Sequence, residues 1–426
     1  MKIKAILSVS LAILALFLSS CLEDSCNESR TFIEYESVYI SPSEMRVTPT
    51  LSSPRDLRET GKIYFYNNYI LLNELHEGIH VIDNADPSNP NNIGFINIPG
   101  NVDIAVSHGN LYADNYADLL TIDISNINAP TLVCRDEDVF TKHWFNENLG
   151  YFAKTKETER TVEVECSDPN FNNNFFWNNG NIFLAEDQSN VLPNAGGAGG
   201  GLSSNVGTGG SLARFTITKG HLYVINDAFE IKAFDIENPA KPLLTESTNV
   251  SWGIETLFPF KDHLFIGAEA GMFIYDISNP STPSYVSEFQ HARACDPVFV
   301  KDNIAFVTLR DGTRCQSFTN QLEVIDVSDI FNPEQLYTYD MDNPHGLSVR
   351  DNNLYICEGT NGLKVFDIED LSRINDNRIA HLDNVDARDV ISLNENHLLV
   401  IGQDGLRQYN TANPSDLQEI SFISTK

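Results

Sequence analysis

The sequence has few basic residues for its number of acidic ones. Lys and Arg together number 28 and Asp and Glu 59, which gives a formal net charge of −31. This balance argues against nucleic acid as a partner and against an electrostatic hold on anionic membranes, because both attract basic proteins. The charge is compatible with cationic ligands or Ca²⁺ but requires neither, since excess charge also keeps a protein soluble.

Long apolar runs and the common enzyme motifs are also missing. Beyond the N-terminal segment, no stretch approaches the ~18 apolar residues of a membrane-spanning helix. The sequence has no G-x-S-x-G elbow, P-loop or H-E-x-x-H, and no C-x-x-C spacing that would suggest zinc. The glycines within residues 196–201 lack the strand–turn–helix context of a phosphate site. An enzyme is therefore the less favoured class.

What the sequence does contain is a repeated phrase. Residues 271–283, GMFIYDISNPSTP, form a short apolar run that ends at Asp276 and is followed by a polar turn with prolines. The spacing of the copies is about 40 residues, which indicates stacked or radial repeats. With one longer step that contains a weak copy, the copies predict eight units. The corresponding positions in the other units are Asp83, Asp123, Glu165, Asp235, Asp326, Asp367 and Asn410.

The content of one unit predicts β-structure. Residues 254–290 contain four runs of β-type residues, each bounded by Gly, Asn, Asp or Pro, and none has a helical apolar period. Four short antiparallel strands in about 40 residues make one propeller blade. The fold class is therefore all-β, a β-propeller of eight or alternatively seven roughly four-stranded blades. The acidic residue at the end of each run is expected to form an Asx-type turn, not a repeated metal site.

The repeated phrase, as in TIDISN and IYDISNP, resembles the LVIVD-repeat β-propellers, which occur largely as lipoproteins and secreted proteins of Bacteroidetes-type bacteria. The resemblance covers nearly all of residues 61–426, and the region Cys295 to Gly362 is especially typical. It implies a propeller fold and little about activity.

The N-terminus has the pattern of an export signal. Lys2 and Lys4 precede an apolar core from Ala5 to Leu18, which is too short to span a bilayer. The sequence from Leu18 to Cys21 resembles a lipobox, so residues 1–20 are expected to be removed and a lipid attached to Cys21. The acidic CLEDSCNE that follows resembles a signal for sorting to the outer face of the outer membrane.

The rest of the chain divides into a tether and the propeller. Residues 21–60 are polar, with one possible strand from Phe32 that we expect at the propeller's edge. The propeller spans residues 61–426 and carries a Gly-rich insertion at about 170–210, which we expect to be a flexible, solvated loop.

Blade geometry predicts which residues share one face. Because strands alternate in direction, the starts of the inner strands and the ends of the second strands lie on the same face, called here the funnel face. Loops on a rigid ring are where propellers usually bind ligands. A wider set on this face also includes His76, Glu77, Asp114, Asp227 and Asp404. The predicted ligand-binding residues are Asp103, His143, Trp144, Trp252, Glu269, Asp296, Arg310, His345, Glu358 and Arg388.

The cysteines suit an oxidising compartment. Seven are present, and lipidation of Cys21 would leave an even number for disulfides. Cys295, Cys315 and Cys357 are all expected near the funnel face. We therefore predict that Cys315 pairs with Cys295 or with Cys357.

Taken together, the sequence predicts a lipid-anchored propeller on the cell surface that binds a glycan, a peptide or another envelope protein. The first alternative is a hydrolase or lyase at the funnel face, acting on a polysaccharide or lactone with or without Ca²⁺. The second is a structural component of an envelope complex.

Overall fold

The computed structural model describes residues 27–141, 145–165, 175–178, 181–184, 206–290, 297–311 and 319–426. The chain divides into two compact units, residues 1–38 with 154–190 and residues 39–153 with 191–426. The larger unit is the propeller. No helix in the described ranges is long and apolar enough to cross a membrane.

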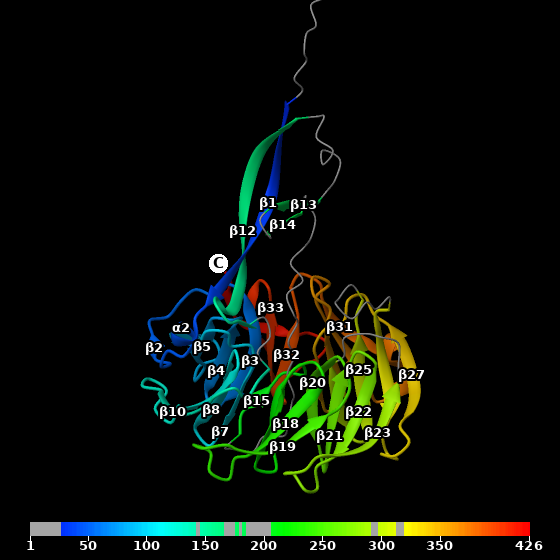
Figure 1. Cartoon of the computed structure of the whole chain (residues 1–426). Helices are drawn as coiled ribbons and strands as arrows, with labels where there is room; N and C mark the ends of the chain where they lie inside the picture. The colour runs from blue at the N-terminus through cyan, green and yellow to red at the C-terminus, as the bar shows by residue number, and fades with distance from the viewer. Residues whose placement is uncertain are drawn as a thin grey trace, which may run out of the picture. The chain divides into compact units, whose positions relative to one another are not determined.

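The larger unit contains seven antiparallel sheets among the described residues, and they follow one another around a ring (Figure 1). Each sheet, or blade, consists of four consecutive strands, and the first strand of each blade is the innermost. Of the two blade counts left open by the sequence, the structure therefore has seven. Blade 1 carries two further short strands, β2 (Leu51–Ser52) on its outer edge and β15 (Thr208–Gly209) on its inner edge.

The strands of blades 1 to 4 are, in order, β3 (Thr60–Tyr66), β4 (Tyr69–Glu74), β5 (Gly78–Asp83) and β6 (Asn91–Asn97); β7 (Ile104–Ser107), β8 (Asn110–Asn115), β9 (Asp118–Asp123) and β10 (Thr131–Asp136); β16 (Phe215–Thr218), β17 (His221–Ile225), β18 (Glu230–Asp235) and β19 (Leu243–Asn249); β20 (Ile254–Phe260), β21 (His263–Ala268), β22 (Gly271–Asp276) and β23 (Ser284–Gln290).

Those of blades 5 to 7 are β24 (Val298–Lys301), β25 (Ile304–Leu309), β26 (Gln321–Asp326) and β27 (Glu334–Asp340); β28 (Leu347–Arg350), β29 (Asn353–Cys357), β30 (Leu363–Asp367) and β31 (Arg378–Leu382); β32 (Asp389–Asn394), β33 (His397–Gly402), β34 (Gly405–Asn410) and β35 (Gln418–Ser424). The described helices are short, α2 (Pro42–Met45) and the 3₁₀ helix η1 (Leu371–Asn377).

The core lies between the blades. The middle strands are almost continuously buried, as in β22, whereas the outer strand β27 is almost wholly exposed. This matches the near-continuous apolar runs of the middle strands, since both of their faces pack on neighbouring blades. The ring closes in the same way: Ile63 and Leu72 of blade 1 belong to one apolar cluster with Leu399 of blade 7. The backbones of Leu57 and Thr425 also form a parallel bridge at this junction.

The Asp at the end of each third strand forms the expected Asx turn. The Asp276 carboxylate accepts the backbone N–H of Ser278 at 2.6 Å, and the Asp123 carboxylate accepts that of Ser125 at 2.8 Å. The Ser278 hydroxyl also donates to Asp276 and lowers the pKa of this carboxyl group. In blade 7 Asn410 makes the same contact, with the N–H of Ala412 at 2.8 Å. The structural interpretation of the Asp series is confirmed.

The weak third repeat does not form a blade. Glu165, its acidic position, is the last residue of β12 (Gly150–Glu165), a single strand of 16 residues. The sequence of β12 alternates charged residues with Thr and Val, so it lacks the continuous apolar run that burial between two blades requires. The strand expected from Phe32 exists as part of β1 (Asn27–Ile40), but its register partner is β14 (Asn181–Leu184), not a propeller blade.

These strands belong to a separate sheet of five strands in the order β11-β12-β1-β14-β13. The two remaining strands of this sheet are β11 (Phe145–Asn146) and β13 (Phe175–Asn178). The short hairpin of β13 and β14 falls inside the insertion that was expected to be a solvated loop.

The last part of that insertion lies in the propeller's channel. We call residues 206–214 the channel segment. Gly207 donates its N–H to the Val106 carbonyl at 3.0 Å, and Thr208 and Gly209 pair with β3. Further along, Leu347 donates its N–H to the Ser211 hydroxyl at 2.7 Å, and Leu257 donates to the Ala213 carbonyl at 2.8 Å. The segment therefore joins blades 1, 2, 4 and 6 from inside the ring.

The Asx turns should contribute measurably to stability. We expect Asp276→Ala to lower the free energy of unfolding by about 1 kcal/mol, because the Ser278 N–H loses its acceptor. Asp276→Asn should keep most of that stability, since Asn410 fills the same role in blade 7. Urea unfolding of the three proteins measures the difference. Equal stability of Asp276→Ala and the wild type would show that this turn forms without the side chain.

Candidate functional site

Several residues of the predicted site lie outside the residues that the structure describes. They are Cys21, His143, Trp144, Cys295, Asp296 and Cys315. Their predicted roles stay predictions. Cys357 is a buried free thiol whose pKa burial raises, and the pairing of Cys315 with Cys295 or with Cys357 stays a prediction.

Arg310 and His345 meet on the funnel face, as their places at a second-strand end and before an inner strand predict. The Arg310 guanidinium donates to Nε2 of His345, and His345 Nδ1 lies 2.8 Å from the Asn343 carbonyl oxygen. Burial, followed by repulsion from the Arg310 charge, lowers the pKa of His345 to about 3. His345 is therefore neutral, with its proton on Nδ1. Burial, followed by repulsion from Arg388, lowers the pKa of Arg310 to about 10.

Glu358 is fully buried and has structural partners. It accepts the backbone N–H groups of Asp342, at 2.9 Å, and Asn343, and the Lys364 ammonium at 3.0 Å. These contacts tie the funnel-face loop before β28 to blade 6. They explain why a carboxylate is buried at position 358 without invoking a bound ligand.

Asp103 is buried too and anchors the channel segment. Its carboxylate accepts the backbone N–H groups of Arg214 and Phe215, at 2.6 and 3.1 Å, and lies 3.3 Å from the Lys62 ammonium. Lys62 also donates to the Leu212 carbonyl at 2.8 Å, and burial lowers its pKa to about 8. The buried pair thus fixes the end of the segment where it enters blade 3.

The remaining described members of the predicted set are more accessible. Trp252 is 67% exposed, and Glu269 is half-buried beside Gly253. Arg388 donates from Nε to the Asp386 carboxylate at 3.1 Å. The structure does not gather these three with Asp103 into one pocket.

A pocket of about 280 Å³ does form on the funnel face between blades 1, 2 and 3. It is lined by Asp103 and by three residues of the wider set, His76, Asp114 and Asp227, together with Arg214. Burial raises the pKa of Asp114 to about 6 and lowers that of His76. The carboxylate of Asp114 accepts the N–H groups of Val102 and Asp103, at 2.8 and 3.0 Å, so it also holds this loop.

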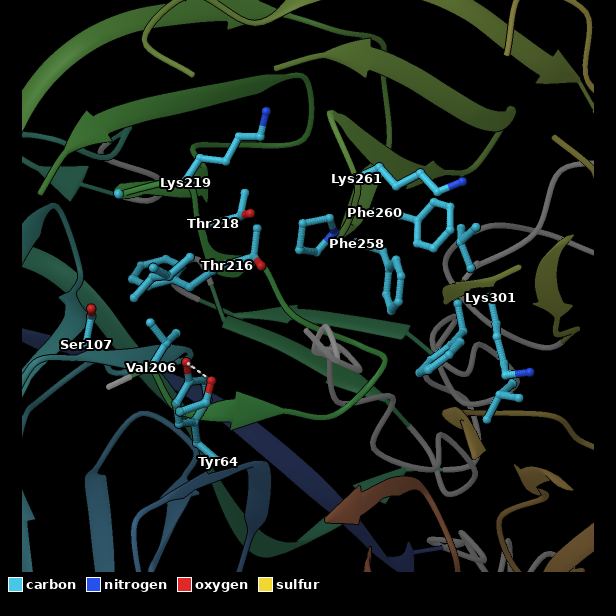
Figure 2. Close-up of a pocket in the computed structure, with 18 of the residues that line it drawn as sticks. Tyr64, Ser107, Val206, Thr216, Thr218, Lys219, Phe258, Phe260, Lys261 and Lys301 are labelled. Atoms are coloured by element: carbon cyan, nitrogen blue, oxygen red, sulfur yellow. Dashed lines mark hydrogen bonds between the residues drawn. The ribbon is translucent and has the colours of Figure 1, made fainter. Parts of the chain in front are cut away.

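The larger cavity opens on the opposite face, where each inner strand turns into the second strand. We call this the hairpin face. The cavity has a volume of about 750 Å³ and is lined by residues of β7, β16, β20, β24 and β28 and of the turns that follow them (Figure 2). Val206 and Gly207 of the channel segment also line it. Within the described strands, β16, β20, β24 and β28 each stand at the end of their sheet, so none of them has a neighbouring strand on its channel side.

Four basic residues stand around this cavity, one from each of blades 3 to 6. They are Lys219, Lys261, Lys301 and Arg350, each at the end of an inner strand or in the turn that follows it. Figure 2 shows the three lysines extending from separate strands of the cavity wall. Between them lie uncharged groups, among them the Thr216 and Thr218 side chains. Phe258 and Phe299 pack against each other with ring centroids 4.7 Å apart.

The prediction from sequence missed this cavity. The signal was present in the repeat, because four successive units carry a basic residue within one position of the same turn, in TKG, FKD, VKD and VRD. The path of the channel segment could not be predicted, because most of its partners are distant in sequence. The segment contacts inner strands of blades 4 and 6, and the cavity lies at the hairpin face of the channel.

Comparison with known families agrees with the repeats. Residues 100–136, 261–290 and 344–376 match the LVIVD repeat. These stretches cover blade 2, the last three strands of blade 4 and most of blade 6. The chain thus contains stretches similar to the LVIVD repeat within a β-propeller-like structure.

Several solved structures are similar to this chain at low sequence identity. The computationally designed Ika8 protein superposes with a TM-score of 0.51 at 10% sequence identity, over 88% of this chain and 92% of that chain. The periplasmic gluconolactonase PpgL of Pseudomonas aeruginosa gives a TM-score of 0.47 at 11% identity, over 89% and 97% of the two chains. BamB from Moraxella catarrhalis gives 0.46 at 8%, over 88% and 96%. No curated protein matches the sequence.

A structural role for Glu358 predicts a large loss of stability on its removal. We expect Glu358→Ala to lower the free energy of unfolding by about 3–5 kcal/mol, because Lys364 is left as a buried charge without its main partner. Asp342→Ala is the matched control. Its side chain is 63% exposed, so removing this second partner of Lys364 should cost about 1 kcal/mol or less. Chemical denaturation measures both, and similar losses would contradict the assignment.

The neutral state of His345 predicts acid sensitivity. Its pKa in the folded protein, about 3, lies below the ordinary value of 6.5, so between these values only the unfolded chain binds the proton. The contribution of neutral His345 to the free energy of unfolding is complete above pH 6.5. It is lost as the pH falls towards 3, by about 1.4 kcal/mol per pH unit. His345→Asn should flatten the pH dependence of unfolding in this range. His381→Asn, at an exposed histidine, is the matched substitution for comparison. The same slope in all three proteins would contradict a neutral His345.

Proposed function

We propose that the protein is a lipid-anchored binding module of the cell envelope whose ligand enters the cavity on the hairpin face. The observation that supports this most is the cavity itself. A volume of about 750 Å³ falls within the ~300–1,000 Å³ of pockets that hold drug-sized ligands. Its wall combines open strand edges with hydroxyl, aromatic and basic side chains from successive blades.

The anchor and the location come from the N-terminal sequence. An apolar segment too short to span a bilayer, followed by Leu18-Ser19-Ser20-Cys21, supports lipidation of Cys21 and attachment to the outer membrane. The acidic residues after Cys21 support exposure on the cell surface. The partner in this proposal is a glycan, a peptide or another envelope protein.

Binding without chemistry is favoured by the groups that line the cavity. The ionisable side chains there are mainly exposed Lys, Arg and Asp residues at the ends of hairpins, and the buried ionisable groups of the funnel face hold loops and the channel segment. A rigid ring that presents fixed groups from several strands suits recognition.

One observation supports the alternative of a hydrolase or lyase on the funnel face. The pocket of about 280 Å³ contains Asp114, whose pKa burial raises to about 6, close to Asp227 and His76. A carboxyl group tuned towards neutral pH suits general acid–base catalysis. Turnover of a polysaccharide or lactone that is lost in Asp114→Asn would favour this alternative.

The cavity can be tested by filling it. Thr218 is half-buried in the wall of the cavity, so Thr218→Trp should block part of it. A thermal-shift screen of the full chain against glycans and peptides, followed by calorimetry, identifies binders. We expect their affinity to fall at least about tenfold in this variant, because the indole occupies ligand volume.

The matched control is Thr248→Trp, at a half-buried threonine of the outer strand β19, outside the cavity lining. It should bind as the wild type does. Binding that survives in Thr218→Trp would contradict the proposal, and so would a broad panel that contains no binder.

A further inference from the structure

The charge of the cavity differs from that of the whole chain. The chain has about twice as many acidic as basic residues, yet the residues that line the cavity include four cations and two carboxylates, Asp302 and Asp351. His108 lines it as well. The cations come from four successive blades, so they surround one side of the space. Such a local excess of positive charge in a concave site attracts anions.

The turns themselves do not explain two of these lysines. Lys219 and Lys261 occupy the first turn position after the inner strand, with φ of 49° and 54°. This left-handed conformation favours Gly, Asn, Asp and His, and the corresponding positions in four other blades are Asn67, His108, Asp302 and Asp351. The conformation of the other two turns therefore does not account for their long basic side chains.

The present partners of the lysines are replaceable. Lys219 pairs with Asp262, which is 63% exposed, and Lys301 pairs with Asp302, which is 80% exposed. Exposed ion pairs of this kind are weak, because solvent screens both charges, so an anionic ligand competes with them readily. Lys261 donates to the Asn303 side chain at 2.6 Å, a neutral acceptor.

Arg350 is held more firmly and keeps donors for a ligand. Its Nη2 donates to the Ser392 carbonyl at 3.1 Å, and its Nε lies 3.4 Å from the Ser392 hydroxyl. These contacts orient the guanidinium and use only part of its five N–H donors. An oriented guanidinium suits bidentate contact with a carboxylate or sulfate.

The uncharged part of the wall suits a sugar chain. A pyranose ring has hydroxyl edges and apolar faces, and the cavity lining includes the hydroxyl side chains of Thr216 and Thr218 and the rings of Phe260 and Phe299. The channel-side edges of β16, β20 and β24, which stand at the ends of their sheets, add backbone N–H and C=O groups that suit sugar hydroxyls.

We propose that the ligand of this cavity is an acidic oligosaccharide, and that Lys219, Lys261, Lys301 and Arg350 bind its carboxylate or sulfate groups. This rests on the proposed function and names the ligand class for the same cavity. The ligand's charged groups meet cations from successive blades while its ring faces lie against the phenylalanines.

The test uses three tetrasaccharides as probes, tetragalacturonate, its fully methyl-esterified form and a sulfated maltotetraose, and adds hexaglutamate as an anion that is not a sugar. Binding to the full chain is measured by calorimetry at low and at moderate salt. We expect at least one charged probe to bind about tenfold or more tighter than the neutral ester, and to weaken as salt rises, because ionic contacts are screened. The uronate and sulfate arms show which acidic group is preferred.

The variants assign the cations. The double variant Lys219→Gln/Lys261→Gln should bind the charged probe about tenfold more weakly than the wild type. The salt dependence of this affinity should also be smaller, because two ionic contacts are removed. Lys241→Gln, at an exposed lysine outside the cavity lining, is the matched control and should bind normally. Unchanged melting temperatures confirm that both variants are folded.

The outcomes separate the two proposals. Binding of the neutral ester as tight as that of the charged probes, or tighter binding of hexaglutamate than of any sugar, overturns the ligand class. If Thr218→Trp abolishes that binding, the cavity remains the binding site. Binding of a charged probe that Thr218→Trp leaves intact overturns both. If the charged probe no longer binds to Thr218→Trp but still binds normally to the double lysine variant, the assignment of the cations is wrong. If none of the three tetrasaccharides binds, the ligand class is wrong.

Discussion

Every inner strand of a closed propeller has one edge without a neighbouring strand, and that edge faces the channel. Its N–H and C=O groups need partners, because a buried unpaired group costs as much as a lost hydrogen bond. Here the channel segment supplies partners to the inner strands of blades 1 and 2 and to single positions of blades 4 and 6. The other channel-facing edges are left to line the cavity. The need for hydrogen-bond partners at these strand edges therefore explains both the part of the channel that the segment fills and the part that remains a cavity.

The same requirement explains the buried charges. The channel segment crosses the starts of several inner strands, and Asp103 and Lys62 are the groups that hold its end. Gly210 is needed there, because a Cβ at this position would come within 2.0 Å of the Asp389 carboxylate. Burial raises the pKa of Asp389 to about 7. Ionisable residues near the funnel face thus serve the packing of a segment that comes from a distant part of the chain.

The repeat made the blade predictable, because each level of the pattern agrees with the others. The apolar run before Asp276 gives the buried strand, and the carboxylate gives the turn. Glu165 misled the blade count, since the spacing fitted but the run before it carries charges at alternate positions. Arg310 and His345 were correctly placed on one face. Strand direction predicts the face on which a residue lies, but it does not show which groups the residue contacts. The Asp103 carboxylate already accepts the backbone N–H of Arg214, which is more than a hundred residues away in sequence.

The cavity was missed for the complementary reason. Its cations lie in turns on the hairpin face, where exposed lysines are expected in any propeller and carry no individual signal. Their meaning comes only from the closure of the ring, which brings blades 3 to 6 around one space. Turn positions contribute little to the core, so residues there can change without loss of the blade. The division between buried middle strands and variable turns lets one repeat specify the fold while a few turn residues specify what the channel binds.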